Sequence, residues 1–172
     1  MVSPEFGTRK EKEQFVGYAH NFERYVSIDN QLIDRLAQSL QHGFLSPQEA
    51  QRLGVPYGKS LNITFRGFRD ADNIIYLFPV RILNSVPRWS NAVSVVFDRS
   101  LEVLSYEEMR EYQGGHWPHL SPTGGEVYVF GRIEPSHLRQ ILLPNPSVQE
   151  IEQTRELVIK HAPTIADRIT IM

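Results

Sequence analysis

Residues 121–144 read SPTGGEVYVFGRIEPSHLRQILLP, and the rest of the chain can be interpreted outward from them. A proline- and glycine-containing turn leads into Glu126 and then into the apolar run 127–130. Alternate side chains of a β-strand point to opposite faces, so Val127 and Val129 would face away from the two aromatic residues of this run. Both faces are apolar, which predicts a strand that is covered on both sides.

Glu126 stands where this strand meets the glycine turn. A carboxylate at such a point is a candidate site residue, because a buried strand would fix its position. It is equally consistent with an ordinary solvated strand end, which is the more common setting for an ionised side chain. Gly131 and Pro135 end the strand, and a second apolar run follows at 138–143.

The composition is that of a globular domain. The 172 residues are 41% hydrophobic and 22% charged, which suits one domain with a core of useful size. The net charge of -2 excludes a surface that is basic throughout, although it leaves room for a local basic groove. The absence of cysteine excludes disulfides, thiol nucleophiles and thiolate metal sites.

The chain offers no sign of a membrane segment. Its longest apolar run, 74–80, is far too short to cross a bilayer, and the polar start shows no signal peptide. We therefore expect a soluble monomer without a membrane partner. Residues 1–9 read as a remnant of cloning or a disordered start, which leaves residues 10–172 for the domain.

One periodic run and three capping boxes predict the helices. Apolar residues at helical spacing indicate a helix over 29–42 that Gly43 ends. Ser-x-x-Glu boxes begin at Ser46, Ser105 and Ser147. They predict short helices to about residues 53 and 112, and a longer one to about residue 161. The glutamates of these boxes have a structural role and are discounted as catalysts.

The remaining runs predict the strands. They lie at 15–20, 60–65, 73–80, 92–97, 127–130, 138–143 and 165–171. Helices and strands do not alternate regularly, so a doubly wound sheet is disfavoured. The sequence predicts a mixed α+β fold, with about seven strands in split, largely antiparallel sheets and three or four helices.

Two motifs look like ligand sites and fail on spacing. Residues 54–60, GVPYGKS, resemble a phosphate-binding loop, but only three residues separate the glycines and the segment runs from helix to strand. Ser60 could still line a pocket, with a solvated turn as the plainer interpretation. His116 and His119 are spaced like metal ligands, and His137 or a carboxylate could be the third, but Pro118 breaks the helical geometry and no second spaced pair appears. No metal is expected.

Two other side chains are candidate site residues. Trp117 could stack on a ligand ring or cover the edge of the core. His20 ends the first predicted strand, where a histidine is more often a hydrogen-bonded structural residue than a ligand contact. The sequence has no Gly-x-Ser-x-Gly elbow and no convincing pair of carboxylates, which disfavours serine hydrolases and glycosidases.

The order of these elements resembles the ADP-ribosyltransferase fold, and within it the bacterial toxins that modify DNA bases. In that family an early strand carries a histidine, and a helix follows that ends in a hydrophobic-x-x-Gly-Leu sequence. A late Glu-Val-x-Val segment, followed by Ile-x-Pro, carries the catalytic glutamate. The matching parts here are His20, residues 42–46 (HGFLS) and residues 126–135 (EVYVFGRIEP).

The resemblance implies that NAD is consumed as a substrate, which would mean intracellular action. It implies that Glu126 is catalytic, holding a hydroxyl of the nicotinamide-side ribose and stabilising an oxocarbenium-like transition state. It further implies that His20 hydrogen-bonds the adenosine-side ribose and that Tyr57 or Trp117 flanks the nicotinamide. Ser60 is a further candidate for the cofactor pocket.

Several alternatives stay open. The chain lacks a clear Gly-x-Tyr-Phe-Ala segment, and the arginine that the DNA-modifying toxins use could be Arg66, Arg69 or Arg81. An RNA 2′-phosphotransferase of the same fold family, a catalytically silent binding module and an unrelated α+β interaction domain are the other interpretations. The acceptor could be a protein side chain, a DNA base, an RNA end or a small molecule.

Overall fold

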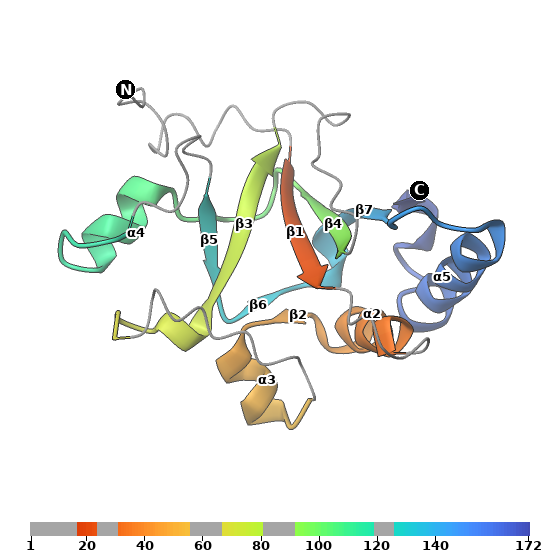
Figure 1. Ribbon diagram of the computed structural model, residues 1–172, viewed down its shortest axis with the longest axis horizontal. Helices are drawn as coiled ribbons and strands as arrows, with labels where there is room; N and C mark the ends of the chain where they lie inside the picture. The colour runs from red at the N-terminus through yellow and green to blue at the C-terminus, as the bar shows by residue number, and fades with distance from the viewer. Residues whose placement is uncertain (1–16, 24–30, 56–66, 81–91, 119–125) are drawn as a thin grey trace.

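The computed structural model describes residues 17–23, 31–55, 67–80, 92–118 and 126–172 (Figure 1). Within these ranges, four α-helices and two β-sheets form a mixed α+β fold, which confirms the predicted fold class. The helices are α2 (Gln31–His42), α3 (Pro47–Leu53), α4 (Tyr106–Tyr112) and α5 (Val148–His161).

The larger sheet has six strands in the order β5-β3-β1-β4-β7-β8. They are β1 (Gly17–Glu23), β3 (Ile74–Val80), β4 (Ala92–Asp98), β5 (Val127–Phe130), β7 (Leu138–Leu142) and β8 (Thr170–Ile171). Neighbours are antiparallel except β7 and β8, which are parallel. A smaller sheet pairs β2 (Phe44–Leu45) with β6 (Arg132–Ile133). The sheets are therefore split and largely antiparallel, as predicted.

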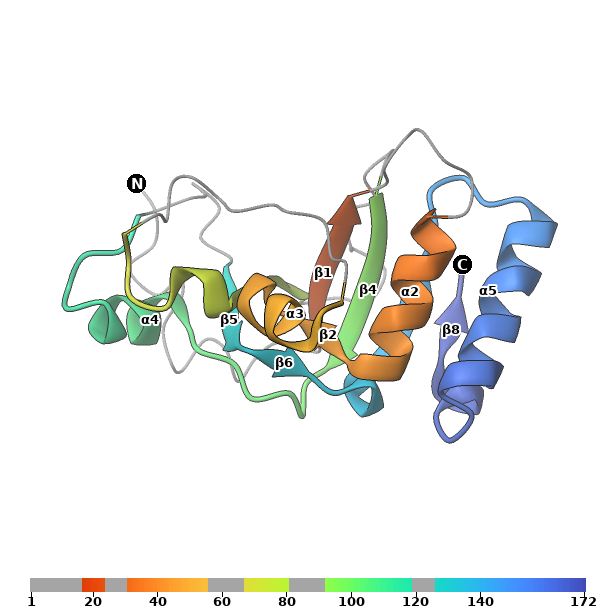
Figure 2. The same ribbon diagram turned by 90° about the horizontal axis from the view of Figure 1, so that it is seen from below.

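Helices α2 and α5 cover one face of the large sheet, and α4 covers part of the other. Figures 1 and 2 show α2 beside α5, and their buried side chains join one core cluster with side chains of β1, β3, β4, β5 and β7. Helix α4 lies beside β5 on the opposite face, where Met109 packs with Ile74, Trp117 and Tyr128. The strand that follows Glu126 is therefore covered on both faces, as its apolar pattern predicts.

The outer edge of β5 is closed by the segment that leads into α4. The backbone N–H of Leu104 donates to the carbonyl oxygen of Tyr128 at 2.8 Å, and the N–H of Tyr128 donates back at 2.9 Å. Because both backbone groups of Tyr128 point outward to Leu104, its pairing with Tyr76 on β3 is of the closer, non-hydrogen-bonded kind.

The sheet forks between β1 and β3. The two strands pair only where residues 17–19 meet residues 78–80. Beyond that point, residues 20–23 pair with β4, and residues 74–77 pair with β5. Figure 1 shows the two strands diverging below their paired ends.

Local signals explain most helix and strand ends. Gly43 ends α2 as predicted, with φ of +94° and its N–H on the carbonyl oxygen of Ser39 at 2.9 Å. The Ser105–Glu108 capping box forms both of its bonds. At Ser46, the hydroxyl accepts from the N–H of residue 49, but the carboxylate of that residue pairs with an arginine instead.

The predicted strand at 165–171 is wrong in extent. Only Thr170–Ile171 is a strand, and Ala166–Arg168 forms a 3₁₀ turn. The turn lets Ile165 enter the core, where it is 4% exposed. The two-residue strands β2 and β6 were not predicted, since they are too short to show a periodic pattern. The strand predicted at 60–65 lies outside the described residues.

Candidate functional site

Glu126 lies on the face of the large sheet that α4 covers. It directly precedes β5, and its Oε2 accepts a hydrogen bond from the hydroxyl of Tyr128. Residues two apart along a strand share a face, so Glu126 shares the face of Tyr128 and of its β3 partner Tyr76. The rings of Tyr76 and Tyr128 meet edge to face, with centroids 5.8 Å apart.

A chain of hydrogen bonds ties this carboxyl to the interior. The indole Nε1 of Trp117 donates to the Tyr128 hydroxyl at 2.9 Å, and that hydroxyl donates to Glu126 at 3.0 Å. On α4, the hydroxyl of Tyr106 donates to the carbonyl oxygen of Trp117 at 2.8 Å. The position of the carboxyl is therefore set by α4, by the loop that follows it and by β5.

Aromatic rings surround this chain. Trp117 meets Tyr128 edge to face at 5.5 Å and meets Phe68 in the same way at 5.3 Å. Tyr128 is fully buried, and Trp117 is 6% exposed. The carboxyl of Glu126 therefore has a water-poor, aromatic environment on its inner side.

This environment changes the acidity of the carboxyl. Burial raises the pKa of Glu126 from 4.5 to about 7, and the hydrogen bond from Tyr128 offsets only part of that rise. Burial, and then the charge of Glu126, also raise the pKa values of Tyr76 and Tyr128, so both phenols keep their protons near neutral pH. A carboxyl that titrates near neutrality can act as an acid, a base or a charge at working pH.

His20 lies at the fork between β1 and β3. Its Nδ1 is 2.9 Å from the carbonyl oxygen of Tyr76, so this nitrogen carries the proton and donates it. Its strand partner on β4 is Val95, whose side chain belongs to the core cluster that α2 and α5 cover. Strand alternation therefore assigns His20 to the face opposite Glu126, and the structure does not bring the two together on one face.

Of the other candidate residues, the structure describes Trp117 and Arg69. Trp117 has the core position that was one of its two interpretations, because its ring packs on protein and its N–H is bound. Arg69 places its guanidinium over the ring of Tyr112 at 4.5 Å and lies 4.0 Å from Asp70. The remaining candidates lie outside the described residues: Tyr57, Ser60, Arg66 and Arg81.

Tyr128 is a functional candidate that the sequence did not single out. A usable signal was present, since Tyr128 follows Glu126 by two residues in a strand and so shares its face. The partner Trp117 carried no such signal, because it reaches Tyr128 from a loop rather than from a periodic element.

A second polar cluster contains serine, histidine and aspartate. The Oδ1 of Asp98 accepts from the backbone N–H of Ser100 at 3.1 Å and from its hydroxyl, and it lies 3.6 Å from the Nδ1 of His137. The Ser100 hydroxyl is 3.2 Å from the same Nδ1. In a catalytic triad the serine and the carboxylate bond opposite ring nitrogens, so this cluster is not one.

The cluster instead forms the turn that ends β4. The N–H of Leu101 donates to the carbonyl oxygen of Asp98 at 3.2 Å, and Arg139 forms an ion pair with the same carboxylate. Burial acts to raise the pKa of Asp98, but the Ser100 hydrogen bonds, the charge of Arg139 and the His137 contact outweigh it and lower that pKa.

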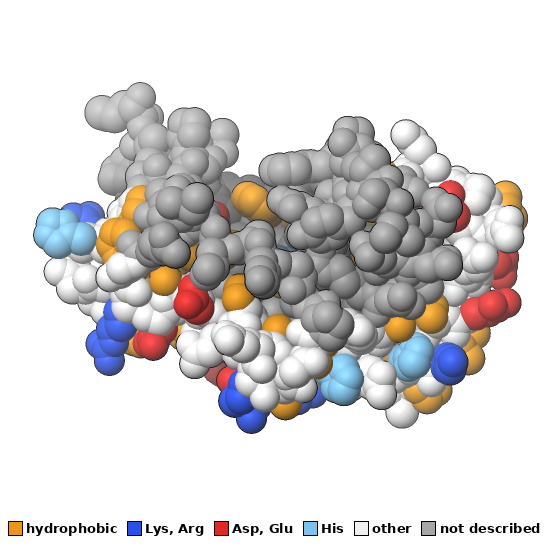
Figure 3. Space-filling model, turned by 60° about the horizontal axis from the view of Figure 1, so that its bottom comes forward, with side chains coloured by type: hydrophobic (Ala, Val, Ile, Leu, Met, Phe, Trp, Pro, Cys, Tyr) orange, Lys and Arg blue, Asp and Glu red, His pale blue; other side chains and the backbone are white. Residues whose placement is uncertain are grey.

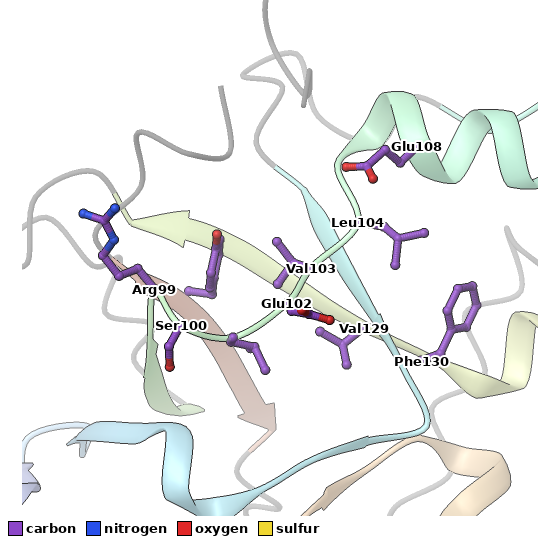
Figure 4. A pocket seen from close by; sticks show the side chains of 10 residues that line it. Arg99, Ser100, Glu102, Val103, Leu104, Glu108, Val129 and Phe130 are labelled. Carbon is purple, nitrogen blue, oxygen red and sulfur yellow. The ribbon is translucent and has the colours of Figure 1, made fainter. Parts of the chain in front are cut away.

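A cavity of about 670 Å³ opens between β5 and the segment 99–104. Figure 4 shows Arg99 at one end of it and Glu108 toward the other, with Val103 between them and Val129 near Phe130. Glu126 does not line this cavity, and Val129 belongs to the core cluster of the opposite sheet face. The cavity is therefore separate from the carboxyl.

The surface offers few further signals. On the face in Figure 3, acidic and basic side chains of the described residues are mixed at the lower left, and acidic ones predominate at the right edge. In the described ranges, no three His, Asp or Glu side chains are grouped as metal ligands would be. No helix in those ranges is long and apolar enough to cross a bilayer.

A scan of the chain against protein-family models and a search among curated proteins found no match. We therefore infer the function from the chemistry of Glu126 and its neighbours. That chemistry combines a carboxyl at the start of a buried strand, a hydroxyl donor directed at it and aromatic rings around both.

Proposed function

We propose that this protein is an NAD-dependent mono-ADP-ribosyltransferase, which transfers ADP-ribose to a macromolecular acceptor and releases nicotinamide. The observation that carries this proposal is the setting of Glu126, a hydrogen-bonded and partly desolvated carboxyl at the entry to a covered strand. The segment that it begins is also the part of the sequence that most resembles the catalytic segment of that family.

The reaction calls for a negative charge beside the ribose of NAD. The bond between ribose C1 and the nicotinamide nitrogen breaks, its electron pair leaves with nicotinamide, and C1 gains positive, oxocarbenium-like character. A nucleophile of the acceptor then bonds to C1 and loses its proton. Ionised Glu126 would stabilise the developing positive charge, and its water-poor surroundings would strengthen that interaction.

Binding of NAD would itself favour the charged form of Glu126. With its pKa raised to about 7, the carboxyl is close to half ionised at neutral pH. The nicotinamide ring of NAD is positively charged, and an opposite charge nearby lowers the pKa of a carboxyl. The hydroxyl of Tyr128 acts in the same direction, since it donates to the carboxylate.

Glu126 is the residue on which this proposal depends. The family resemblance gives His20 a role at the same nucleotide, which would require its imidazole and the carboxyl of Glu126 to reach one ligand. Strand alternation assigns the two side chains to opposite faces, so His20 supplies no support here.

Nicotinamide release from NAD tests the proposal. Wild-type protein, Glu126→Gln and Glu134→Gln would be compared with and without cell lysate. Glu126→Gln keeps the size of the side chain and removes its charge, whereas Glu134 is an exposed carboxylate of the same segment, paired with Arg132 at 3.1 Å. We expect release by the wild type and by Glu134→Gln, and a loss of about 10²–10³-fold in Glu126→Gln.

Thermal unfolding of each variant would show that the fold is kept. Release that depends on lysate would identify a macromolecular acceptor. If the wild type does not cleave NAD in any of these conditions, or if Glu126→Gln cleaves it as fast, the proposal is wrong. A binding module with a silent site would then be the better interpretation.

A further inference from the structure

The hydrogen bonds that end at Glu126 have a fixed direction. An indole N–H can only donate, so the 2.9 Å contact makes the oxygen of Tyr128 the acceptor of the Trp117 proton. The single hydroxyl hydrogen of Tyr128 is then directed to Glu126, at 3.0 Å. With the indole N–H as the donor to its oxygen, the phenol keeps its own hydrogen for the carboxylate of Glu126.

Trp117 is itself held firmly enough to impose this direction. It is 6% exposed, its carbonyl oxygen accepts from Tyr106, and its ring lies edge to face against Phe68. Such burial leaves no open ring face on which a ligand of nicotinamide size could stack. The buried indole therefore does not serve to stack on a ligand, and its role is the hydrogen bond that its N–H donates to Tyr128.

We infer that Trp117 is a positioning residue for Glu126, acting through the hydroxyl of Tyr128. The three groups fix one carboxylate oxygen and supply a hydrogen bond that favours the ionised carboxyl. This inference rests on the proposed function for its catalytic meaning, because an ionised Glu126 is the form which that reaction needs. The hydrogen-bond chain itself does not depend on NAD.

Among the described residues, the titratable groups coupled to Glu126 are Tyr128 of β5 and Tyr76 of β3. Tyr106 of α4 acts on Tyr128, and Asp72 acts on Tyr76. The pKa values of Tyr76 and Tyr128 are raised, so both stay neutral while the carboxyl titrates.

The test is a titration of the Glu126 δ-carbon in protein labelled with carbon-13 glutamate, its resonance identified by comparison with Glu126→Gln. The variants are Tyr128→Phe, Trp117→Phe and their combination. Replacement of Trp117 by 3-benzothienylalanine, with sulfur in place of the indole N–H, keeps the shape of the ring if the smaller phenylalanine unfolds the protein. Phe68→Leu is the control, since it loosens the packing of Trp117 without touching either hydrogen bond.

We expect Tyr128→Phe to raise the titration midpoint by about one pH unit, and loss of the indole N–H to raise it by a smaller amount. In the Tyr128→Phe background, loss of the N–H should change nothing further, because its route to Glu126 is already absent. Phe68→Leu should leave the midpoint where it is.

The inference is overturned if loss of the indole N–H moves the Glu126 titration midpoint equally in the wild-type and Tyr128→Phe backgrounds. It is also overturned if that loss leaves the midpoint of the wild type unchanged, or if Phe68→Leu moves the midpoint. The titration uses no NAD, so it can succeed even if NAD cleavage is never observed. If NAD is cleaved, the acidic limb of the rate against pH should move upward in the same variants.

Discussion

Glu126 is a residue whose neutral form is favoured by the fold. Its pKa is about 7 in the folded protein and close to 4.5 when solvated, so the folded state binds more protons between these pH values. Its contribution to the free energy of unfolding is therefore complete below about pH 4.5 and is lost as the pH rises through 7. A site that needs this carboxyl ionised works against the stability of the fold.

This conflict predicts how stability responds to pH. The unfolding free energy of Glu126→Gln minus that of the wild type should increase by about 2–3 kcal/mol from pH 5 to pH 8. The reason is that the wild type acquires a buried charge as the pH rises, whereas the variant does not. Urea unfolding of both proteins at several pH values measures the difference. A difference that stays constant with pH would contradict the raised pKa, and the exposed Glu134→Gln should show no such gain.

At the scale of elements, the connection from α2 to β2 packs closely against β6. A side chain at Gly43 would place its Cβ 2.5 Å from the Nε of Arg132 and 3.1 Å from the carbonyl oxygen of Ile133. Both neighbours belong to β6, which follows the Glu126 strand after Gly131. Gly43 therefore holds the small sheet close to the strand that carries the candidate site.

Alanine substitutions at Gly43 and at Gly54 separate the cost of backbone strain from the cost of steric crowding. Gly54 also has a positive φ, of +67°, but a Cβ added there would have open space around it, with no packing neighbour within 4 Å. We expect Gly54→Ala to cost about 1 kcal/mol of stability through backbone strain alone. Gly43→Ala should cost roughly 1–2 kcal/mol more, because the backbone oxygen cannot move aside. Equal losses in chemical denaturation would show that the close approach is relieved at no cost.

Elements with a strong local signal could be predicted from the sequence. The capping box at Ser105 and the glycine after α2 mark their helices because the signal and the structure it causes are adjacent in the chain. The 3₁₀ turn at Ala166–Arg168 could not be predicted, since it is set by the demand for Ile165 in the core. Glu126 was found by its place before a strand, whereas its link to Trp117 is a tertiary contact.

At the scale of the molecule, the fork in the sheet separates the two residues that the sequence had grouped. Motif order places a histidine on one strand and a glutamate on another, but it does not give the face. A shift of one residue in strand register reverses the face of every side chain, so only the observed pairing decides it. That pairing sets His20 opposite Val95, and it sets Tyr128, whose face Glu126 shares, opposite Tyr76.

The fork gives His20 a structural role that can be measured. His20→Ala would remove the hydrogen bond from its imidazole to Tyr76 and should lower the unfolding free energy by about 1 kcal/mol. Nicotinamide release by the folded variant should stay within a few-fold of the wild type, because His20 faces away from Glu126. A loss as large as that of Glu126→Gln, with the fold intact, would place His20 in the same site after all.

The edge contact between Leu104 and Tyr128 couples the site to the cooperativity of the whole fold. Tyr128 orients the carboxyl through its side chain and closes the sheet edge through its backbone, so unfolding of this edge would disturb both. Heat or denaturant would then remove the carboxyl's alignment and the sheet edge in a single event. In the wild type, any NAD cleavage by the proposed site should then be lost along the same curve as global unfolding.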